Sequence, residues 1–274
     1  MNAGLERARE LLQGARAIVV LTGAGVSAES GVPTFRGAGG LWRSHRPEQL
    51  ATAEAFARDP RLVWEWYAWR RSVVRACAPN PAHLALARLA LERDHVTLVT
   101  QNVDGLHHRA ADATAQSGAG SGAVSGRAAA RAYPLEVHGA VHRDRCAGCG
   151  ARSSGRAEID ASSVATLPRC QACGSLLRPD VVWFGEPLEP AVLGRAFAAA
   201  ETADVCLVVG TSSVVYPAAA IPEIALAKGA AVIEVNPEAT PLSRYATTTV
   251  RAAAGLAVPA LLQTTAPCGS STDG

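Results

Sequence analysis

The sequence predicts a doubly wound α/β fold with a parallel central sheet. Short, continuous apolar runs alternate with segments of helical periodicity, which is typical of strands buried on both faces between helices. A glycine-rich turn directly follows the first apolar run. Two Cys-x-x-Cys pairs interrupt the alternation in the second half of the chain and indicate a smaller lobe.

The first half of the chain holds three expected helical segments and two expected strands. Leu5–Leu12 has helical spacing and ends near Gly14, which is a common residue after a helix. Ala17–Leu21 is a continuous apolar run and predicts a buried strand. A mainly helical segment rich in aromatic residues, a further helix and a second buried strand follow at Ala51–Ala76, Ala82–Arg93 and His95–Thr100.

The second half continues the same alternation. We expect strands at Val205–Gly210 and Ala231–Val235, with the helix Pro217–Lys228 between them and a closing helix at Ala257–Gln263. Ala111–Ala132 consists almost entirely of Ala, Gly, Ser and Arg without periodicity, so we predict a flexible surface insertion there. A polar tail occupies residues 265–274.

Composition excludes several classes of protein. The 274 residues are 49% hydrophobic and 18% charged, with a formal net charge of +2, which is too apolar and too neutral for a disordered chain. No apolar run approaches about 18 residues, so no membrane span is predicted. The balanced charge gives no indication of nucleic-acid binding. The first residues lack a secretory signal, and we expect a cytoplasmic protein.

Four of the seven cysteines form two closely spaced pairs, Cys146/Cys149 and Cys170/Cys173. Twenty residues separate the pairs, and this spacing indicates a tetrahedral zinc site. Because four thiolates fill every coordination position, we expect a structural zinc ion rather than a catalytic one. A redox pair is the alternative. The smaller lobe would then combine a zinc ribbon with a helical insertion.

The glycine turn after the first strand fits a dinucleotide-binding loop. Gly23 permits a tight turn, Gly25 lets the backbone approach a pyrophosphate, and the small Ala28 allows a helix to pack closely on the strand. The same pattern also occurs in ordinary strand-to-helix turns. The usual acidic residue about 20 positions later is missing. Asn236 and Glu238, which follow the strand Ala231–Val235, are candidates to hold the adenosine ribose instead.

Five motifs in order resemble those of the sirtuins, the NAD-dependent protein-lysine deacylases. They are Gly23–Gly37, Thr100–His107, Glu136–Gly139, Val182–Glu186 and Gly210–Ser213. The resemblance covers about Leu12–Leu262. It implies one catalytic domain at 1–264, with a large Rossmann-like lobe from 1–36, 84–140 and 181–264 and a small lobe from 37–83 and 141–180.

The resemblance also implies a mechanism. The amide oxygen of an acyl-lysine attacks the NAD ribose as nicotinamide leaves, and acyl-ADP-ribose is released. His138 is similar to the family's general base, a role that suits an imidazole because its pKa lies near neutrality. Asn102 would orient the ribose or a water molecule, and Asp104 would bind the nicotinamide carboxamide. NAD would be the co-substrate.

Further NAD contacts are implied around the glycine turn and at the ends of the later strands. Phe35 and Arg36 would belong to a loop that closes over the ribose. The complete implied set is Gly23, Ala24, Gly25, Ala28, Glu29, Pro33, Thr34, Phe35, Arg36, Trp42, Gln101, Asn102, Val103, Asp104, Gly210, Thr211, Ser212, Asn236, Pro237, Glu238 and Ala254. Ala254 stands where relatives often carry a turn that touches the adenine, so only its backbone could serve.

Tyr67 and Arg70 are spaced three residues apart, which puts both on one face of a helix. A phenol and a guanidinium could hold a carboxylate. The plainer interpretation is an aromatic helix face packed on the core, with Arg70 exposed. This Tyr-x-x-Arg looks like the element of the desuccinylase/demalonylase subgroup of sirtuins. It implies a preference for malonyl, succinyl or glutaryl groups.

We expect the acylated peptide to bind by strand addition between Val182–Glu186 and Ser213–Tyr216. Val182, Phe184, Gly185 and Glu186 are the expected contacts, and acylated-lysine proteins are the expected partners of a monomeric enzyme. A broad deacetylase, a mono-ADP-ribosyltransferase and a non-catalytic NAD-sensing module are the alternatives.

Overall fold

The computed structural model describes residues 2–34, 47–118, 126–156 and 158–263. Within these residues a parallel sheet of six strands has the order β3-β2-β1-β7-β8-β9. The strands are β1 (Ile18–Thr22), β2 (Val96–Thr100), β3 (Leu135–Glu136), β7 (Val205–Val209), β8 (Ala231–Val235) and β9 (Thr248–Val250). This order reverses between β1 and β7, as in the doubly wound fold that the sequence predicts.

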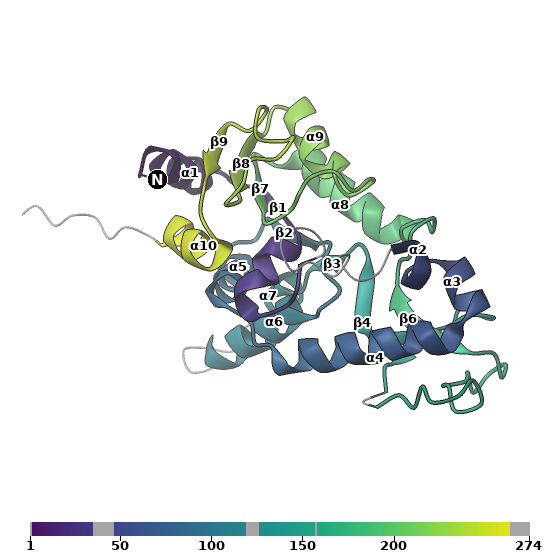
Figure 1. The fold of residues 1–274 in the computed structure, drawn as a ribbon. Helices are drawn as coiled ribbons and strands as arrows, with labels where there is room; N and C mark the ends of the chain where they lie inside the picture. Colours follow the sequence, from purple (N-terminus) through teal and green to yellow (C-terminus); the bar gives the residue numbers. More distant parts are fainter. Residues whose placement is uncertain (1, 35–46, 119–125, 157, 264–274) are drawn as a thin grey trace, which may run out of the picture.

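Helices cover both faces of the sheet (Figure 1). The helices α1 (Asn2–Gly14), α5 (Pro81–Glu92) and α10 (Ala254–Leu262) pack on one apolar face. The helices α8 (Pro190–Thr202) and α9 (Ala220–Ala227) pack on the other. Alternate residues of β1 enter opposite cores, Ile18 and Val20 on one side and Val19 and Leu21 on the other, which explains why the strand is apolar throughout.

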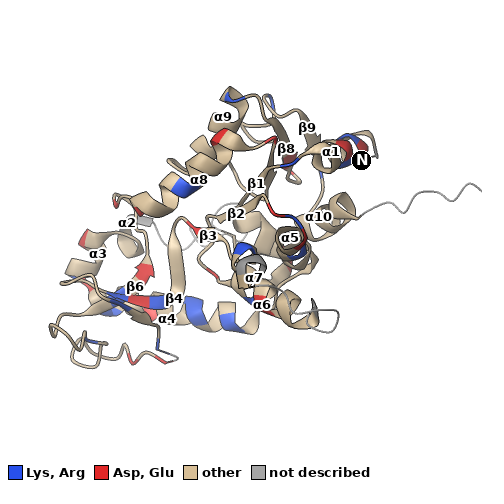
Figure 2. Cartoon of the chain, turned by 180° about the vertical axis from the view of Figure 1, so that it is seen from behind, with Lys and Arg blue, Asp and Glu red and all other residues tan. Residues whose placement is uncertain are grey.

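The small lobe combines three helices with an antiparallel sheet of order β5-β4-β6. Its strands are β4 (Gly139–Cys146), β5 (Arg152–Ser154) and β6 (Leu177–Val181), and its helices are α2 (Pro47–Leu50), α3 (Ala53–Arg58) and α4 (Pro60–Ala76). Asp59 separates α3 from α4 because it caps the start of α4, where its side chain accepts a hydrogen bond from Leu62 N. Pro60 then occupies the first position of α4, where the missing amide hydrogen costs nothing. Figure 2 shows basic residues concentrated on α4 and β4.

The predicted insertion at Ala111–Ala132 is mostly helical, so its prediction as an irregular segment is wrong. Helix α6 (Leu106–Gly118) runs through its first part and α7 (Gly126–Ala132) forms its last. Ala110, Ala111 and Ala132 are buried, and α7 packs on α5. Alanine is a strong helix former, and its small side chain lets these helices lie close to their neighbours. The low complexity of the segment hid its periodicity. The part at 119–125 lies outside the described residues.

The remaining predicted elements are confirmed with small shifts of their ends. The segment Ala51–Ala76 is helical but divided at Asp59, and the closing helix begins at Ala254 rather than Ala257. Helix α8 and the short strands β3 and β9 lacked a recognised signal in the sequence. Residues 265–274 lie outside the described part of the chain.

Candidate active site

The glycine turn and the predicted residues that follow β2, β7 and β8 stand at the carboxyl ends of parallel strands, on either side of the reversal between β1 and β7. The glycine turn after β1 packs directly against Gly210, which follows β7. Gly25 N donates to Gly210 O at 2.7 Å, and Gly23 N donates to Val209 O at 3.0 Å. A Cβ on Gly25 would lie 2.7 Å from Gly210 Cα, and Gly210 itself has φ +61°. Glycine is therefore required on both sides of this contact.

The helix that follows the glycine turn differs from the expected one. Residues Ala24–Ser30 form a 3₁₀ helix, in which Val26 and Ser27 are the buried residues. Ala28 is exposed, so the expectation that its small side chain permits close helix packing is wrong. The close approach is made by Gly25 and Gly210 instead.

His138 is half-buried at the end of β3, next to β2. Its Nδ1 lies 3.0 Å from Gln101 O. Because a carbonyl oxygen only accepts, Nδ1 carries the proton in the neutral ring and Nε2 keeps its lone pair. Burial lowers the pKa of His138 below its ordinary value, although the Gln101 carbonyl acts in the opposite direction. The net lowering of the pKa favours a neutral imidazole, which can accept a proton at Nε2.

Ser27, Asn102 and Asp104 form a buried hydrogen-bonded group beneath the glycine turn. Asn102 Nδ2 donates to Ser27 Oγ at 3.0 Å, and Ser27 Oγ donates to Asp104 Oδ2 at 2.8 Å. The other carboxylate oxygen of Asp104 accepts from Leu106 N at 2.9 Å, at the start of α6. Two donors therefore fix the Asp104 carboxylate in one orientation. The predicted catalytic residues Asn102 and Asp104 come together, with Ser27 as a link that the sequence analysis missed.

Two buried histidines, His83 and His107, support this group, and neither was predicted. His83 Nε2 lies 3.2 Å from Ser27 Oγ, and its Nδ1 accepts from Asn80 N at the start of α5. The histidine rings pack edge to face with centroids 4.7 Å apart. Burial lowers the pKa of His83 to about 4 and that of His107 well below its ordinary value. Both rings are therefore neutral at pH 7. The sequence pattern that could have identified His83 is its place as the third residue of a helix that Asn80 caps, where a polar side chain can bond the backbone of the cap.

Tyr67 and Arg70 lie on one face of α4, as predicted, and both are buried, at 2% and 8% exposure. The Arg70 guanidinium carbon lies 4.9 Å from the centre of the Trp66 ring and 5.8 Å from that of Tyr67. The interpretation with an exposed Arg70 is therefore wrong. Burial lowers the pKa of Arg70, and a hydrogen bond with Tyr67 and the charge of Asp104 oppose that shift. The electrostatic effect of Asp104 indicates that this end of α4 approaches the buried polar group.

The phenol of Tyr67 connects α4 to the predicted peptide-binding loop. Trp183 Nε1 donates to Tyr67 Oη at 2.9 Å, and the neighbouring Val182 N donates to His138 O at 2.9 Å. Burial raises the pKa of Tyr67, so the phenol keeps its proton. Its oxygen accepts from Trp183 and Arg70, which leaves the hydroxyl hydrogen to donate to a third group. Trp183 was not among the predicted residues.

Most amide hydrogens of the loop after β6 donate to other groups of the chain. Trp183 N donates to Glu186 Oε2, Phe184 N donates to Ala51 O, and Glu186 pairs with Arg178. Glu186 therefore holds the loop in shape rather than presenting its carboxylate to a ligand. Phe184 is 53% exposed, and the residues after Ser213 expose Val214 and Tyr216. Ser213 itself has φ +53°, an uncommon backbone conformation for a residue other than glycine.

The candidate residues for the adenosine side lie together after β7 and β8. Gln101 Nε2 donates to Thr211 Oγ1 at 2.9 Å, and Asn236 Nδ2 donates to Thr211 O at 2.9 Å. Asn236 Oδ1 accepts from Glu238 N at 3.3 Å, so both ends of the Asn236 amide are engaged. Ser212, Pro237 and Glu238 are exposed at the surface of this region.

Arg251 and Glu234 shape this loop and were not predicted. Glu234, at 1% exposure, pairs with Arg251 at 2.8 Å and accepts hydrogen bonds from Thr240 and Ser243. The Arg251 guanidinium also donates to the carbonyls of Asn236 and Glu238, at 3.4 and 3.0 Å. A charged residue in the middle of an apolar strand was the signal that could have identified Glu234.

The other predicted contacts take different positions. Glu29 Oε2 accepts from Gly255 N at 2.5 Å and so caps helix α10, next to Ala254 at the first position of that helix. Val103 is buried, and its carbonyl accepts from Val141 N. Pro33 and Thr34 are half-buried at the end of the described segment. Phe35, Arg36 and Trp42 lie outside the described residues.

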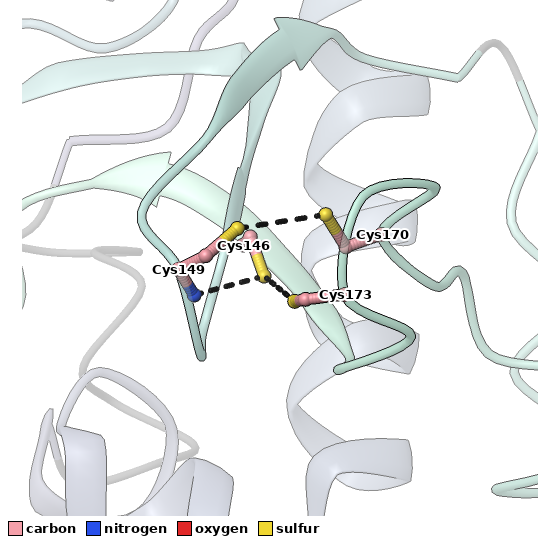
Figure 3. Close-up of side chains that lie close together, drawn as sticks. All are labelled: Cys146, Cys149, Cys170 and Cys173. Atoms are coloured by element: carbon pink, nitrogen blue, oxygen red, sulfur yellow. Dashed lines mark hydrogen bonds between the residues drawn. The ribbon is translucent and has the colours of Figure 1, made fainter.

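Four cysteines form a metal-binding cluster in the small lobe, shown in Figure 3. The Sγ atoms of Cys146, Cys149, Cys170 and Cys173 all lie within 4.8 Å of one another, with pairs at 3.4 and 3.7 Å. A tetrahedral zinc ion with bonds of about 2.3 Å requires sulfur separations of about 3.8 Å, so the four residues fit it. Gly148 N and Cys149 N donate to Cys146 Sγ, which favours the thiolate. Zinc here would hold together the two loops that carry the pairs.

Comparisons with known proteins agree with this geometry. The Sir2 family model matches residues 23–217. The chain is 48% identical over 263 residues to the "NAD-dependent protein deacylase" of Thermococcus kodakarensis, covering 94% of this chain and 95% of that protein. A solved Sir2 homolog–NAD complex has a TM-score of 0.79 at 44% identity, over 94% and 92% of the two chains. The structure of Sir2Af2 bound to a myristoylated histone peptide has a TM-score of 0.71 at 33% identity, over 96% of each chain.

Proposed function

The chain belongs to the Sir2 family, the sirtuins, and we propose that it is an NAD-dependent protein-lysine deacylase that prefers acyl groups ending in a carboxylate. The family match and the name of the Thermococcus relative support the deacylase activity. The buried Tyr67/Arg70 pair supports the acyl preference. None of the described helices is long and apolar enough to cross a membrane.

The residues at the strand ends fit a bound dinucleotide. The amide hydrogens of Gly23 and Gly25 already bond Val209 and Gly210, so the turn would offer the Ala24 amide to the phosphates. Thr211 would offer its hydroxyl group to the ribose, and the Asn236–Glu238 loop borders the same region. NAD supplies a ribose carbon that becomes reactive toward an amide oxygen as nicotinamide leaves. The site contributes a fixed orientation of these groups and a buried setting that excludes water.

His138 would act as the general base. Its Nδ1 hydrogen is held by the Gln101 carbonyl, so Nε2 can accept a proton from a ribose hydroxyl. Because burial lowers the pKa of His138, the neutral form predominates at pH 7. The hydrogen bond from Val182 N to His138 O ties this residue to the loop that would hold the peptide.

The single observation that carries the acyl preference is the burial of Arg70 beside Tyr67, next to the loop of His138. A neutral acyl group in this setting offers the Arg70 guanidinium and the Tyr67 phenol no charged acceptor. A terminal carboxylate accepts hydrogen bonds from both. Burying a carboxylate without such partners is costly, so the pair should discriminate strongly between succinyl and acetyl groups.

The peptide carrying the acyl-lysine would lie extended between the loop of Phe184 and the segment Ser213–Tyr216. The exposed side chains of Phe184, Val214 and Tyr216 support this position, since apolar groups left at the surface often mark a binding site. Within the loop, Trp183 N and Phe184 N already have partners in the chain. The carbonyl groups and Gly185 N are therefore the candidates for pairing with the peptide.

The test compares kcat/KM on two peptides that differ only in an acetyl or a succinyl group on the lysine. We expect the wild type to favour the succinyl peptide. Arg70→Met should lower kcat/KM for that peptide by about 100-fold and leave the acetyl peptide nearly unchanged, as expected when one buried charged contact is lost. Arg61→Met, on the exposed side of the same helix, is the matched control. An equal loss on both peptides would contradict the acyl preference.

A broad deacylase without this preference is the second candidate. The solved relative that holds a myristoylated peptide favours it, because that protein accepts a long apolar acyl chain. Similar kcat/KM values for acetyl, myristoyl and succinyl peptides in the wild type would select this candidate and leave the NAD-dependent chemistry intact.

A further inference from the structure

A cavity lies at the opposite end of the parallel sheet from the candidate active site. Its volume is about 370 Å³, and it opens between α7 and α8 beside the first residues of β1 and β2. Val96, Thr97 and Leu98 of β2 line it. The candidate active site begins after Thr100, and at about 3.3 Å per residue Leu98 and Gln101 lie roughly 10 Å apart along the chain.

The edge of β2 leaves backbone donors at this cavity. His95 O accepts from Ile18 N, and Gln101 N donates to Thr22 O, so the odd-numbered residues of this strand face β1. Val96 and Leu98 consequently face the β3 side. Strand β3 pairs only with Val99 and Thr100. The amide hydrogens of Val96 and Leu98 thus have no strand partner among the described residues, and Leu135 of β3 lines the same cavity.

Two arginines line the cavity from opposite helices. Arg195 of α8 makes no hydrogen bond or ion pair with any residue in the described part of the chain. Arg131 of α7 pairs with Asp94 at 2.9 Å through one terminal nitrogen, while its Nε is buried without a partner. Asp94 is the only acidic residue among those that line the cavity, and its side chain is 81% exposed.

The cavity is therefore rich in donors and poor in acceptors. The terminal guanidinium nitrogens of Arg131 and Arg195 are the donors that a ligand in the cavity can reach, since the Arg131 Nε is closed off from solvent. Two guanidinium groups match the double negative charge and the several oxygens of a phosphate group. The unpaired amides of the β2 edge provide the additional donors that phosphate sites commonly use.

We propose that this cavity binds a small phosphate-bearing molecule, at a site separate from that of the dinucleotide. The phosphate would lie between Arg131 and Arg195 and accept from the edge of β2. The source is either free inorganic phosphate or a small phosphate monoester, since both carry the same group. The proposal does not depend on the deacylase activity.

The test is calorimetric titration of the full chain, with ADP-ribose present at saturation to occupy the dinucleotide site. Inorganic phosphate and glycerol 3-phosphate are titrated separately, and the one with the higher affinity identifies the source. Arg195 is exposed on α8, so Arg195→Ala should fold normally. We expect it to weaken binding by about tenfold, as for the loss of one charge-assisted contact.

Two further variants keep the test decisive. Ala199→Leu, one turn along α8, fills the cavity without changing a charge and should abolish binding. Arg61→Ala, on the exposed side of α4, removes an arginine elsewhere and should leave the affinity unchanged. The proposal is overturned if wild-type protein gives no saturable heat with either probe. It is equally overturned if Arg195→Ala and Ala199→Leu bind as the wild type does.

Discussion

The two ends of the candidate site are built in different ways. The end at the parallel sheet uses small polar residues, Ser27, Asn102 and Asp104, whose side chains bond one another and leave little freedom. The end at α4 uses large side chains, Tyr67 and Arg70, that reach in from the small lobe. In the proposed function, the sheet supplies a fixed arrangement for chemistry, and the inserted lobe supplies the side chains that select the acyl group.

This division makes the sheet end the more sensitive to substitution. His138→Ala should lower turnover by at least about 10³-fold, because no other group replaces its Nε2 as a proton acceptor. NAD binding should be nearly unchanged, since the imidazole is held by a backbone carbonyl and not by the glycine turn. The measurement is nicotinamide release together with NAD affinity by calorimetry. His108→Ala is the control, because His108 is partly exposed and contacts Glu136 and Tyr133 rather than the predicted catalytic residues. Full turnover by the His138 variant would refute its role.

Removal of zinc should destabilise the small lobe and leave the stability of the parallel sheet nearly unchanged. Chelation should unfold the loops around Cys146 and Cys170 and abolish activity. The cysteine cluster connects these two loops of the small lobe and has no part in the parallel sheet. Elemental analysis should find one zinc per chain before treatment. Hydrogen exchange should then rise in β4 to β6 and stay low in β1 and β7. A fully active protein without zinc would contradict this account.

Arg251 tests whether the adenosine side needs its supporting contacts. Arg251→Met removes the donors to the carbonyls of Asn236 and Glu238 and leaves Glu234 buried without its partner. We expect KM for NAD to rise about tenfold with little change in kcat, because the loop is proposed to contact the adenosine side and not the reacting ribose. Arg251→Lys should recover part of the loss. An equal fall in kcat with an unchanged KM would show that the loop acts on the chemical step.

The smallest expected effect concerns the buried histidines under the glycine turn. Burial lowers the pKa of His83 to about 4 in the folded chain, whereas the unfolded chain has about 6.5. The unfolded state therefore binds more protons between these values, so stability is complete above about pH 6.5 and falls as the pH drops toward 4. His83→Gln keeps a donor to Ser27 but has no titrating group. We expect the fall in Tm between about pH 6.5 and pH 4 to be smaller in this variant than in the wild type, by several degrees. A Tm profile identical to that of the wild type would exclude His83 as a cause.

The sequence predicted the parts of the molecule where local pattern decides structure. The strand predicted at Val205–Gly210 was placed to within one residue because a strand buried on both faces has an unbroken apolar run. The cysteine cluster followed from spacing, since four thiolates at that spacing have few other uses. Tyr67 and Arg70 were placed on one helix face from their separation alone.

Other features depend on contacts between distant segments, which no local pattern encodes. Trp183 bonds Tyr67 across 116 positions, and Glu29 caps a helix that begins 225 residues later. The exposure of Ala28 depends on the 3₁₀ geometry of its turn. The helices α6 and α7 were missed because a segment of small residues has no apolar periodicity, although alanine favours the helix at every position.

The account as a whole requires that a dinucleotide and an acyl-lysine meet between the two lobes beside His138. Mass spectrometry of the products from NAD and a succinyl-lysine peptide tests this most directly. The account predicts equal amounts of nicotinamide, unmodified peptide and succinyl-ADP-ribose. Protein or peptide that carries ADP-ribose while the succinyl group stays on the lysine would instead identify a transferase, and no release of nicotinamide would contradict the account entirely.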